Sequence, residues 1–365
     1  MEQFALVLRP ICVYNASMKF DPKYTISNRL LGNITRIHSL SAQLNSSRFP
    51  HLVLMEFERT ARAVSAYAST SIEGNPLPLT EVKKILKSRP SHARDSEQEV
   101  LNYNAALEML NKYLEDNDGI VSNDLILRVQ KQVTDQLLPN DQSGFLRLVP
   151  VVVNDPRTGK IVYLPPDAKD VPGLINGLLD YIVTNQAEVD PLILAGIFHK
   201  QFVLIHPFVD GNGRTTRLST KVLLAGMGLN TFNLFSFENY YNQNVTKYFQ
   251  VVGEMGDYYD SVGKIDFTAW LEYFTEGIID ELLRVEKLLP LAGSSPATAL
   301  KPHHEVILDI IREKGFVTDH DYAQRTARAK ATRNLDFQKL LEFELIERRG
   351  QSRASYYVLR GENNN

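Results

Sequence analysis

Residues 206–217 (HPFVDGNGRTTR) bring together, in one short segment, residue types that suit phosphate chemistry. Pro207 interrupts one helical pattern and another begins near Gly213, so the segment predicts a turn that leads into a helix. The first N–H groups of such a helix have no partner within it and bind anions, phosphates above all. Gly211 and Gly213 flank Asn212 and leave the backbone uncovered at this point. The segment therefore predicts a phosphate-binding turn.

Four side chains of this segment add the charges that a polyphosphate needs. Arg214 and Arg217 lie three residues apart and share one helix face, where two guanidinium groups suit a polyphosphate better than a single phosphate. Asp210 offers the hard oxygen ligand that Mg²⁺ prefers beside phosphates. His206 can act as a general base near neutral pH. Each feature alone is most often structural, and it is their combination that favours chemistry.

These residues match the signature of the Fic family, H-P-F-x-[D/E]-G-N-G-R-x-x-R, at every specified position, and the resemblance extends from about residue 20 to residue 274. The resemblance implies a mainly α fold, with a Fic-type helical bundle core and a β-hairpin flap. It also implies an enzyme that moves AMP from Mg²⁺·ATP onto a Ser, Thr or Tyr hydroxyl of a target protein. The motif is intact here, whereas relatives with other transfer reactions usually alter it, so AMP transfer is favoured.

The resemblance assigns a role to each residue of the motif. His206 would deprotonate the target hydroxyl, and Asp210 would hold Mg²⁺. The nucleotide-binding residues that it implies are Gly211, Asn212, Gly213, Arg214 and Arg217. Within that set, Asn212 and the neighbouring N–H groups would form an anion hole. Arg214 would hold the β-phosphate and Arg217 the γ-phosphate.

A second segment, residues 69–74 (STSIEG), is similar to the inhibitory pattern [S/T]-x-x-x-E-[G/N] of one class of Fic proteins. The resemblance implies that Glu73 pairs with Arg217 and blocks productive placement of the γ-phosphate. Without the motif, a Glu before Gly74 and Asn75 would be interpreted as an exposed helix end. Together with the motif, it predicts an autoinhibited enzyme.

Two β-branched stretches, Leu148–Asn154 and Lys160–Leu164, flank a turn-rich loop and predict a β-hairpin. A lone hairpin among helices must lie against them or serve as a flap. The resemblance implies that residues 148–164 are the family's flap, with which an extended segment of the target pairs as an added strand. A purely structural hairpin is the alternative.

Aromatic residues after the motif are candidates for adenine contacts. We assign Tyr240 and Tyr248 to nucleotide binding, from a set that also contains Phe235 and Tyr241. The resemblance does not say which ring stacks on the base, and most of these rings are expected in the core.

Helical periodicity dominates the rest of the chain. The helices that we expect are Pro50–Ser71, Ser96–Tyr113, Asn123–Leu138, Val171–Asn185, Pro191–Leu204, Thr215–Ala225, Val245–Met255 and Phe267–Leu289. Residues 1–95 then form an N-terminal helical region and residues 96–289 the catalytic core. Residues 290–302, rich in Pro, Gly, Ala and Ser, are expected to be a linker.

Residues 303–361 predict a small winged-helix-like domain with helices Glu305–Lys314, Asp319–Thr326 and Lys330–Phe343. Leu345–Arg349 and Ser355–Leu359 would form its wing. Between Arg325 and Arg333 there are four basic residues and no acidic one, as in a DNA-binding surface. A solvated helix face or a docking surface for a protein explains the same pattern.

The composition sets further bounds. The net charge of −3 argues against a strongly basic nucleic-acid binder, and the single cysteine excludes an intramolecular disulfide framework. No apolar run approaches the ~18 residues of a membrane span. We therefore expect a cytoplasmic protein without membrane partners. Two alternatives stay open, namely removal of AMP at the same site and a DNA-binding regulator that senses nucleotide; self-modification and a homodimer are open as well.

Overall fold

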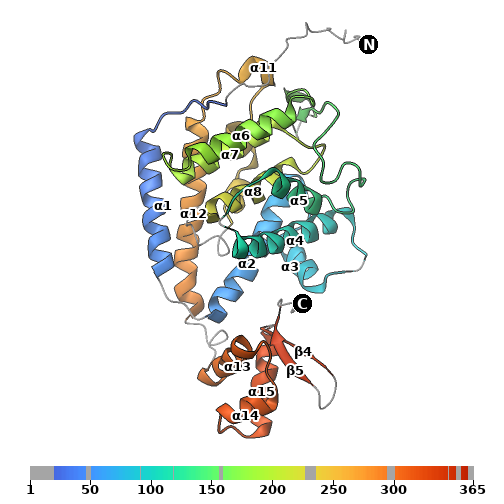
Figure 1. Ribbon diagram of the computed structural model, residues 1–365, viewed down its shortest axis with the longest axis vertical. Helices are drawn as coiled ribbons and strands as arrows, with labels where there is room; N and C mark the ends of the chain where they lie inside the picture. The colour runs from blue at the N-terminus through green and yellow to red at the C-terminus, as the bar shows by residue number, and fades with distance from the viewer. Residues whose placement is uncertain are drawn as a thin grey trace. The chain divides into compact units, whose positions relative to one another are not determined.

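In the computed structural model of this chain, the structure describes residues 20–46, 51–90, 92–117, 119–155, 159–226, 236–293, 301–343, 345–350 and 355–360. The chain divides into two compact units (Figure 1). Residues 58–286, with those before residue 49, make the first unit, and residues 287–365, with residues 49–57, make the second. No described helix has a stretch that is both long and apolar enough to span a membrane.

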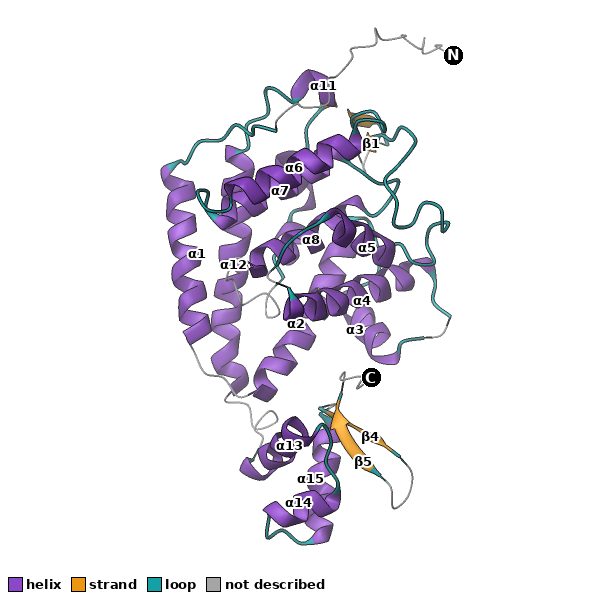
Figure 2. Cartoon of the chain, in the orientation of Figure 1, coloured by secondary structure: helices purple, strands orange, loops and turns teal. Residues whose placement is uncertain are grey.

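The described part of the chain up to residue 293 is mostly helical, as the sequence predicts (Figure 2). Its helices are α1 (Asn28–Ser46), α2 (His51–Ile72), α3 (Leu79–Ser88), α4 (Asp95–Asp116), α5 (Asn123–Val133), α6 (Val171–Asn185), α7 (Pro191–Ile205), α8 (Asn212–Gly226), α9 (Glu238–Gln243), α10 (Val245–Val252), α11 (Tyr258–Ser261) and α12 (Thr268–Gly293).

Helices α7 and α8 form the centre of the first unit. Almost every described side chain of α7 is buried, because this helix is apolar on all sides and packs on α6 and α8. Helix α8 contacts α4 and α5 on its other sides. Gly196 of α7 lets α12 approach closely: Trp270 donates its indole N–H to the Gly196 carbonyl at 2.7 Å, and an added Cβ would meet Leu271 at 2.5 Å. The turn between α7 and α8 is therefore held by two buried helices.

Four of the described helices were not expected from the sequence: α1, α3, α9 and α11. Helix α1 buries residues at helical spacing, Leu30, Ile34, Ile37, Leu40 and Leu44. That spacing is visible in the sequence, but Gly, Asn and Ser between these positions weaken the local helix propensity. Helix α1 lies beside α12 (Figure 1), where Asn33 donates from Nδ2 to the Thr275 hydroxyl at 3.0 Å.

The expected hairpin is present but is shorter and has a third strand. β1 (Val153–Asn154) pairs antiparallel with β2 (Ile161–Leu164), and residues 148–152 are not strand. β3 (Gly256–Asp257) pairs parallel with β2, so the strand order is β1-β2-β3. The helix expected over Val245–Met255 ends at Val252, which leaves the next residues free to form β3. The helix expected over Asn123–Leu138 similarly ends at Val133.

The second unit contains α13 (Pro302–Lys314), α14 (Asp319–Arg325), α15 (Lys330–Glu342) and the antiparallel strands β4 (Ile346–Arg349) and β5 (Tyr356–Leu359). Its core includes Ile307, Ile311, Val317, Tyr322 and Phe337. Elements and order agree with the expected three helices and hairpin, and the winged-helix designation stays a prediction. The expected linker begins too early, because α12 continues to Gly293.

Candidate active site

His206 occupies the turn between α7 and α8 in a left-handed conformation, with φ of 50°. Its N–H closes α7 by donating to the Phe202 carbonyl at 3.1 Å. The Nδ1 atom lies 3.3 Å from the Val203 carbonyl, which can only accept, so Nδ1 carries the hydrogen and Nε2 is the free base. Burial lowers the pKa of the imidazole below its ordinary value, although Glu73 and Asp210 raise it. The ring is therefore neutral, as a general base must be.

Asn212 closes the loop that leads into α8. Its Oδ1 accepts from the Phe208 N–H and its Nδ2 donates to the Phe208 carbonyl, both at 2.9 Å. Both amide atoms thus brace the loop, while Nδ2 has a second N–H, and the anion-hole role of this side chain stays a prediction. The backbone N–H groups at the start of α8, around Gly213, keep the capacity to bind an anion.

Arg217 projects from α8 into the interior and is fully buried. Its Nη2 atom lies 2.7 Å from Glu73 Oε1 and also donates to the Ser69 carbonyl at 2.9 Å. Its Nε donates to the Ser69 hydroxyl at 2.7 Å. Burial lowers the pKa of Arg217, but Glu73, Tyr248 and Tyr103 together outweigh this effect and hold the pKa of the guanidinium above its usual range. The pair that the inhibitory pattern predicts is thus formed.

The Glu73 carboxylate lies directly over the start of α8. A Cβ added to Gly213 would meet Glu73 Oε1 at 2.1 Å and Arg217 Nη1 at 2.9 Å. Arg217 Nη1 is buried and has no hydrogen-bond partner among the described residues. An unpaired donor beside the N–H groups of a helix start is suited to an anion larger than one carboxylate. Glu73 therefore occupies part of a position suited to an anion.

Helix α2, which ends at Ile72 directly before Glu73, is joined to α8 by a buried ionic network. Lys221 of α8 lies 3.2 Å from Glu238 and donates to the Ser65 hydroxyl of α2 at 2.9 Å. Ser65 and Tyr103 donate in turn to Glu238 at 3.0 and 2.7 Å. Breaking up a buried network of this kind is costly. This network therefore holds the body of α2 in place against α8.

Arg214 is almost fully buried and contacts two carboxylates. Its Nη2 lies 2.8 Å from Asp210 Oδ2, and its Nη1 lies 3.4 Å from Glu99 Oε1 of α4. Glu99 also accepts from Asn75 Nδ2 at 2.6 Å, just beyond Glu73 in the chain. The sequence did not reveal Glu99, because nothing in its surroundings along the chain distinguishes it from a solvent-exposed helix residue. The two arginines of the motif are thus both paired with carboxylates.

Exposed apolar side chains lie in the segment that leads into β1. Leu148 is 92% exposed, Val149 52% and Val152 43%. Arg147, immediately before them, is buried and donates from Nε to the His206 carbonyl at 2.8 Å. The segment that we expect to be a flap is therefore attached directly to the turn that carries His206. Arg147 was also missed by the sequence analysis, because its partners are main-chain carbonyls, most of them distant in sequence.

The tyrosines assigned to adenine have different surroundings. Tyr248 is buried, stacks on Tyr241 with ring centroids 4.8 Å apart, and has its hydroxyl 3.1 Å from His199 Nε2. Tyr240 is partly exposed and packs beside Tyr273. Phe235 lies outside the described residues. Adenine binding by Tyr240 and Tyr248 stays a prediction, and the buried ring of Tyr248 would need a rearrangement to meet a base.

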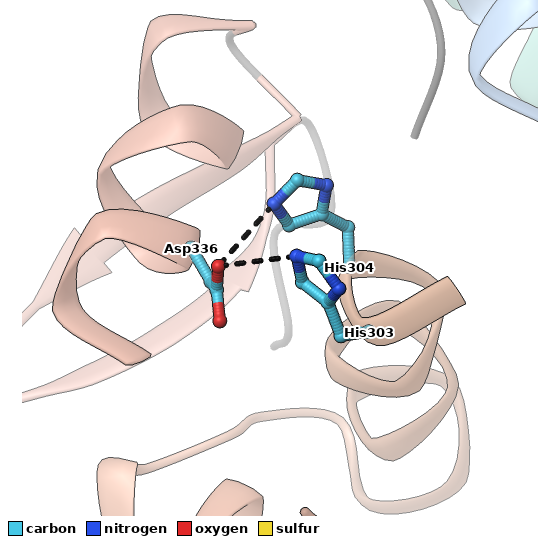
Figure 3. Close-up of side chains that lie close together, drawn as sticks. All are labelled: His303, His304 and Asp336. Atoms are coloured by element: carbon cyan, nitrogen blue, oxygen red, sulfur yellow. Dashed lines mark ion pairs between the residues drawn. The ribbon is translucent and has the colours of Figure 1, made fainter. Parts of the chain in front are cut away.

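In the second unit, His303, His304 and Asp336 bring three potential metal-ligand atoms together (Figure 3). Both imidazole Nε2 atoms point toward Asp336 Oδ1, at 3.3 and 3.6 Å. Asp336 is already paired with Arg328, whose Nε lies 2.7 Å from Asp336 Oδ2. His304 Nδ1 accepts a hydrogen bond from the Lys301 N–H, so the imidazole hydrogen of His304 is on Nε2. The Arg328 guanidinium beside the Asp336 carboxylate and the hydrogen on His304 Nε2 both oppose binding of a metal cation. We interpret this group as a polar cluster, with an ion pair between Arg328 and Asp336, that joins α13 to α15.

The arginines between residues 325 and 333, which suggested a DNA-binding surface, form ion pairs with carboxylates. Arg325 lies 2.6 Å from Glu313, and Arg333 lies 2.8 Å from Asp319. Arg328 contacts Asp336, as described above. Carboxylates inside the unit therefore offset much of the positive charge that the sequence places here.

Comparisons of the sequence with known proteins identify relatives of the segment that contains this site. Residues 120–224 match the model of the Fic/DOC family. A protein adenylyltransferase Fic of Aedes aegypti is 29% identical over 189 residues, which are 51% of this chain and 36% of the relative. One of Nematostella vectensis is 30% identical over 166 residues, 44% of this chain and 37% of the relative. The chain thus spans little more than a third of the length of these curated relatives.

The fold is similar to those of solved Fic proteins. A Fic family protein from Desulfovibrio desulfuricans superposes with a TM-score of 0.61 at 23% identity, covering 95% of this chain and all of the other. Fic-1 from Caenorhabditis elegans gives a TM-score of 0.55 at 24% identity, covering 70% of this chain and 71% of the other. The motif, the helices that hold it and these similarities together show that the chain contains a domain of the Fic/DOC family.

Proposed function

We propose that this chain transfers AMP from Mg²⁺·ATP to a hydroxyl group of a target protein, and that Glu73 restrains the transfer. The observation that carries the proposal is the Glu73 carboxylate, which lies over Gly213 and 2.7 Å from Arg217, in a position suited to a phosphate. The free Nε2 of His206 belongs to the turn that leads into the same helix. A base and an anion site on one turn are the two parts that nucleotidyl transfer requires.

In the proposed reaction, the target hydroxyl loses its proton to His206 Nε2. Its oxygen attacks the α-phosphorus of ATP, and the bond from that phosphorus to the bridging oxygen of the β-phosphate breaks. Pyrophosphate leaves, and AMP remains on the target oxygen. The hydrogen bond from Nδ1 to the Val203 carbonyl stabilises the imidazolium that forms.

The cationic residues of α8 fit the polyphosphate. We propose that Arg214 exchanges Asp210 for the β-phosphate and that Arg217 exchanges Glu73 for the γ-phosphate. Asp210, with half of its side chain exposed, then offers its carboxylate to Mg²⁺. The ion would neutralise part of the charge of the phosphates. Transfers of this type depend on such positioning and charge stabilisation more than on covalent chemistry by the protein.

Restraint by Glu73 follows from competition for Arg217. A nucleotide that places its γ-phosphate beside Arg217 has to displace a carboxylate from a buried, charge-assisted hydrogen bond. Without that displacement, ATP either fails to bind or binds with its phosphates displaced from the productive position. The resting chain is therefore expected to transfer AMP slowly.

We propose that the target binds beside β1. β2 is paired on both edges, with β1 on one side and β3 on the other, so β1 offers the edge at which a strand can be added. The exposed side chains of Leu148, Val149 and Val152 lead into this edge. Main-chain pairing there would hold a target segment near His206 with little dependence on its sequence.

Removal of AMP at the same site is the second candidate. The Glu73 side chain is 32% exposed and close enough to His206 to influence its pKa, so it can orient a water molecule instead of blocking a phosphate. Release of AMP from a modified protein by the wild type, lost in Glu73→Gly, would support this candidate. DNA binding by the second unit is not the function that we propose, because its arginines are paired with carboxylates.

The proposed function is tested with ATP labelled on either the α- or the γ-phosphate. Wild type, Glu73→Gly and His206→Ala are each incubated with Mg²⁺, labelled ATP and a protein extract. Protein-bound label from the α-position alone, strongest in Glu73→Gly and absent in His206→Ala, is the expected result. Label from the γ-position would indicate a kinase instead.

A further inference from the structure

Arg147 is a buried arginine whose partners are main-chain carbonyls. Its side chain is almost completely buried, and no ion pair to a carboxylate is formed by it among the described residues. The guanidinium donates from Nε to His206 (2.8 Å), from Nη1 to Val149 (3.2 Å), and from Nη2 to Pro166 (2.5 Å) and Ile205 (3.4 Å). Burial lowers the pKa of this group. A buried guanidinium without a counter-ion has to be stabilised by hydrogen bonds to these four carbonyl oxygens.

The acceptors belong to three different segments. Val149 lies at the beginning of the flap, Pro166 directly after β2, and Ile205 and His206 in the turn that ends α7. The Arg147 N–H adds a bond to the Pro207 carbonyl at 2.9 Å. Because a guanidinium is planar and rigid, it fixes the positions of these segments relative to one another.

The turn needs support of this kind. His206 is a non-glycine residue with φ of 50°, a conformation that costs roughly 1 kcal/mol or more. The carbonyls at the end of α7 have no partner within the helix and carry its negative end. Arg147 satisfies two of them and supplies a positive charge there.

We infer that Arg147 is a positioning residue that sets the flap and His206 in one fixed relation, so that a target hydroxyl on the flap meets the base. This inference rests on the proposed function and adds a residue to it. A lysine at this position has one ammonium group and cannot reach carbonyls of three segments at once. The positioning role therefore requires the several N–H donors of the planar guanidinium and not only its positive charge.

The test compares Arg147→Lys and Arg147→Met, both in the Glu73→Gly background, with Arg128→Lys as the matched control. Arg128 forms an exposed pair with Asp124, one turn away on α5, and has no part in the site. We expect Arg147→Lys to lower kcat/KM for the protein target by about 10- to 100-fold, while the affinity for ATP changes by less than about 3-fold, because Arg147 does not contact α8. Equal loss of ATP affinity and target turnover would indicate general damage and would overturn the inference. Unchanged kcat/KM would overturn it as well.

A second measurement does not depend on activity. Hydrogen–deuterium exchange of Arg147→Lys should be faster in residues 148–164 and 203–209 together, by at least about 10-fold, and unchanged in α4. Exchange that is unchanged in both segments, or faster throughout the chain, would refute the positioning role. If no variant transfers AMP, the proposed function fails, and the exchange result still decides whether Arg147 connects the flap to the turn. Should Arg147→Met fail to fold, Arg147→Lys and its control carry the comparison.

Discussion

Replacing Glu73 should activate the chain by an amount that the structure allows to be estimated. A hydrogen bond between charged groups contributes about 1.5–3 kcal/mol. Because Glu73 is 32% exposed, we take about 2 kcal/mol for its bond to Arg217. At 1.4 kcal/mol for each factor of ten, this corresponds to about 30-fold faster AMP transfer in Glu73→Gly. Glu73→Gln, which keeps a neutral hydrogen bond, should give a smaller increase of about 5-fold.

The assay is the initial rate of transfer of α-labelled phosphate to protein at a fixed, subsaturating ATP concentration. Glu81→Gln is the matched control, since Glu81 forms an exposed pair with Lys84 at 2.8 Å and lies outside the site. ATP should also stabilise Glu73→Gly against thermal unfolding more than it stabilises the wild type, because Arg217 has lost its carboxylate. Equal rates with and without Glu73 would refute the autoinhibition reasoning.

Three further predictions concern residues around the base and the phosphates. His206→Ala should reduce transfer to background in the Glu73→Gly protein while ATP affinity, measured by calorimetry, stays within about 3-fold; a large loss of affinity would argue against a base. Burial lowers the pKa of His206, so the acid limb of the pH–rate profile should lie below about 6.5. Since Glu73 raises that pKa, its removal should move the limb to still lower pH, and a limb above 6.5 would contradict this. Asn75, in the turn after Glu73, donates a hydrogen bond to Glu99. Asn75→Ala removes this bond and should increase the rate of AMP transfer by about 3- to 10-fold, and it should have no effect when Glu73 is absent.

The sequence predicted the chemistry of the motif because its parts are local. The spacing from His206 to Arg217 places a turn and a helix start next to each other, whatever the rest of the fold does. The pair between Glu73 and Arg217 joins residues 144 positions apart, and it was predicted only through the similarity of a second segment to a known pattern.

What the sequence did not predict depends on contacts between distant segments. β3 has only two residues, and it is a strand solely because β2 lies beside it. Glu99 and Arg147 have no local signal, because their partners come from other helices and from main-chain carbonyls. The motif singled out Asn212, but the sequence did not predict that its side chain also braces the loop through Phe208.

We propose that this site adds AMP to protein and that Glu73 restrains the transfer. Intact-mass spectrometry of one acceptor protein, after incubation with Mg²⁺·ATP and each of wild type, Glu73→Gly and the double variant Glu73→Gly/His206→Ala, tests it most directly. We predict the added mass of an adenylyl group with Glu73→Gly, a much smaller fraction with the wild type and none with the double variant. The added mass of a phosphate, or an adenylyl group in equal amounts with all three proteins, would contradict AMP transfer that is restrained by Glu73.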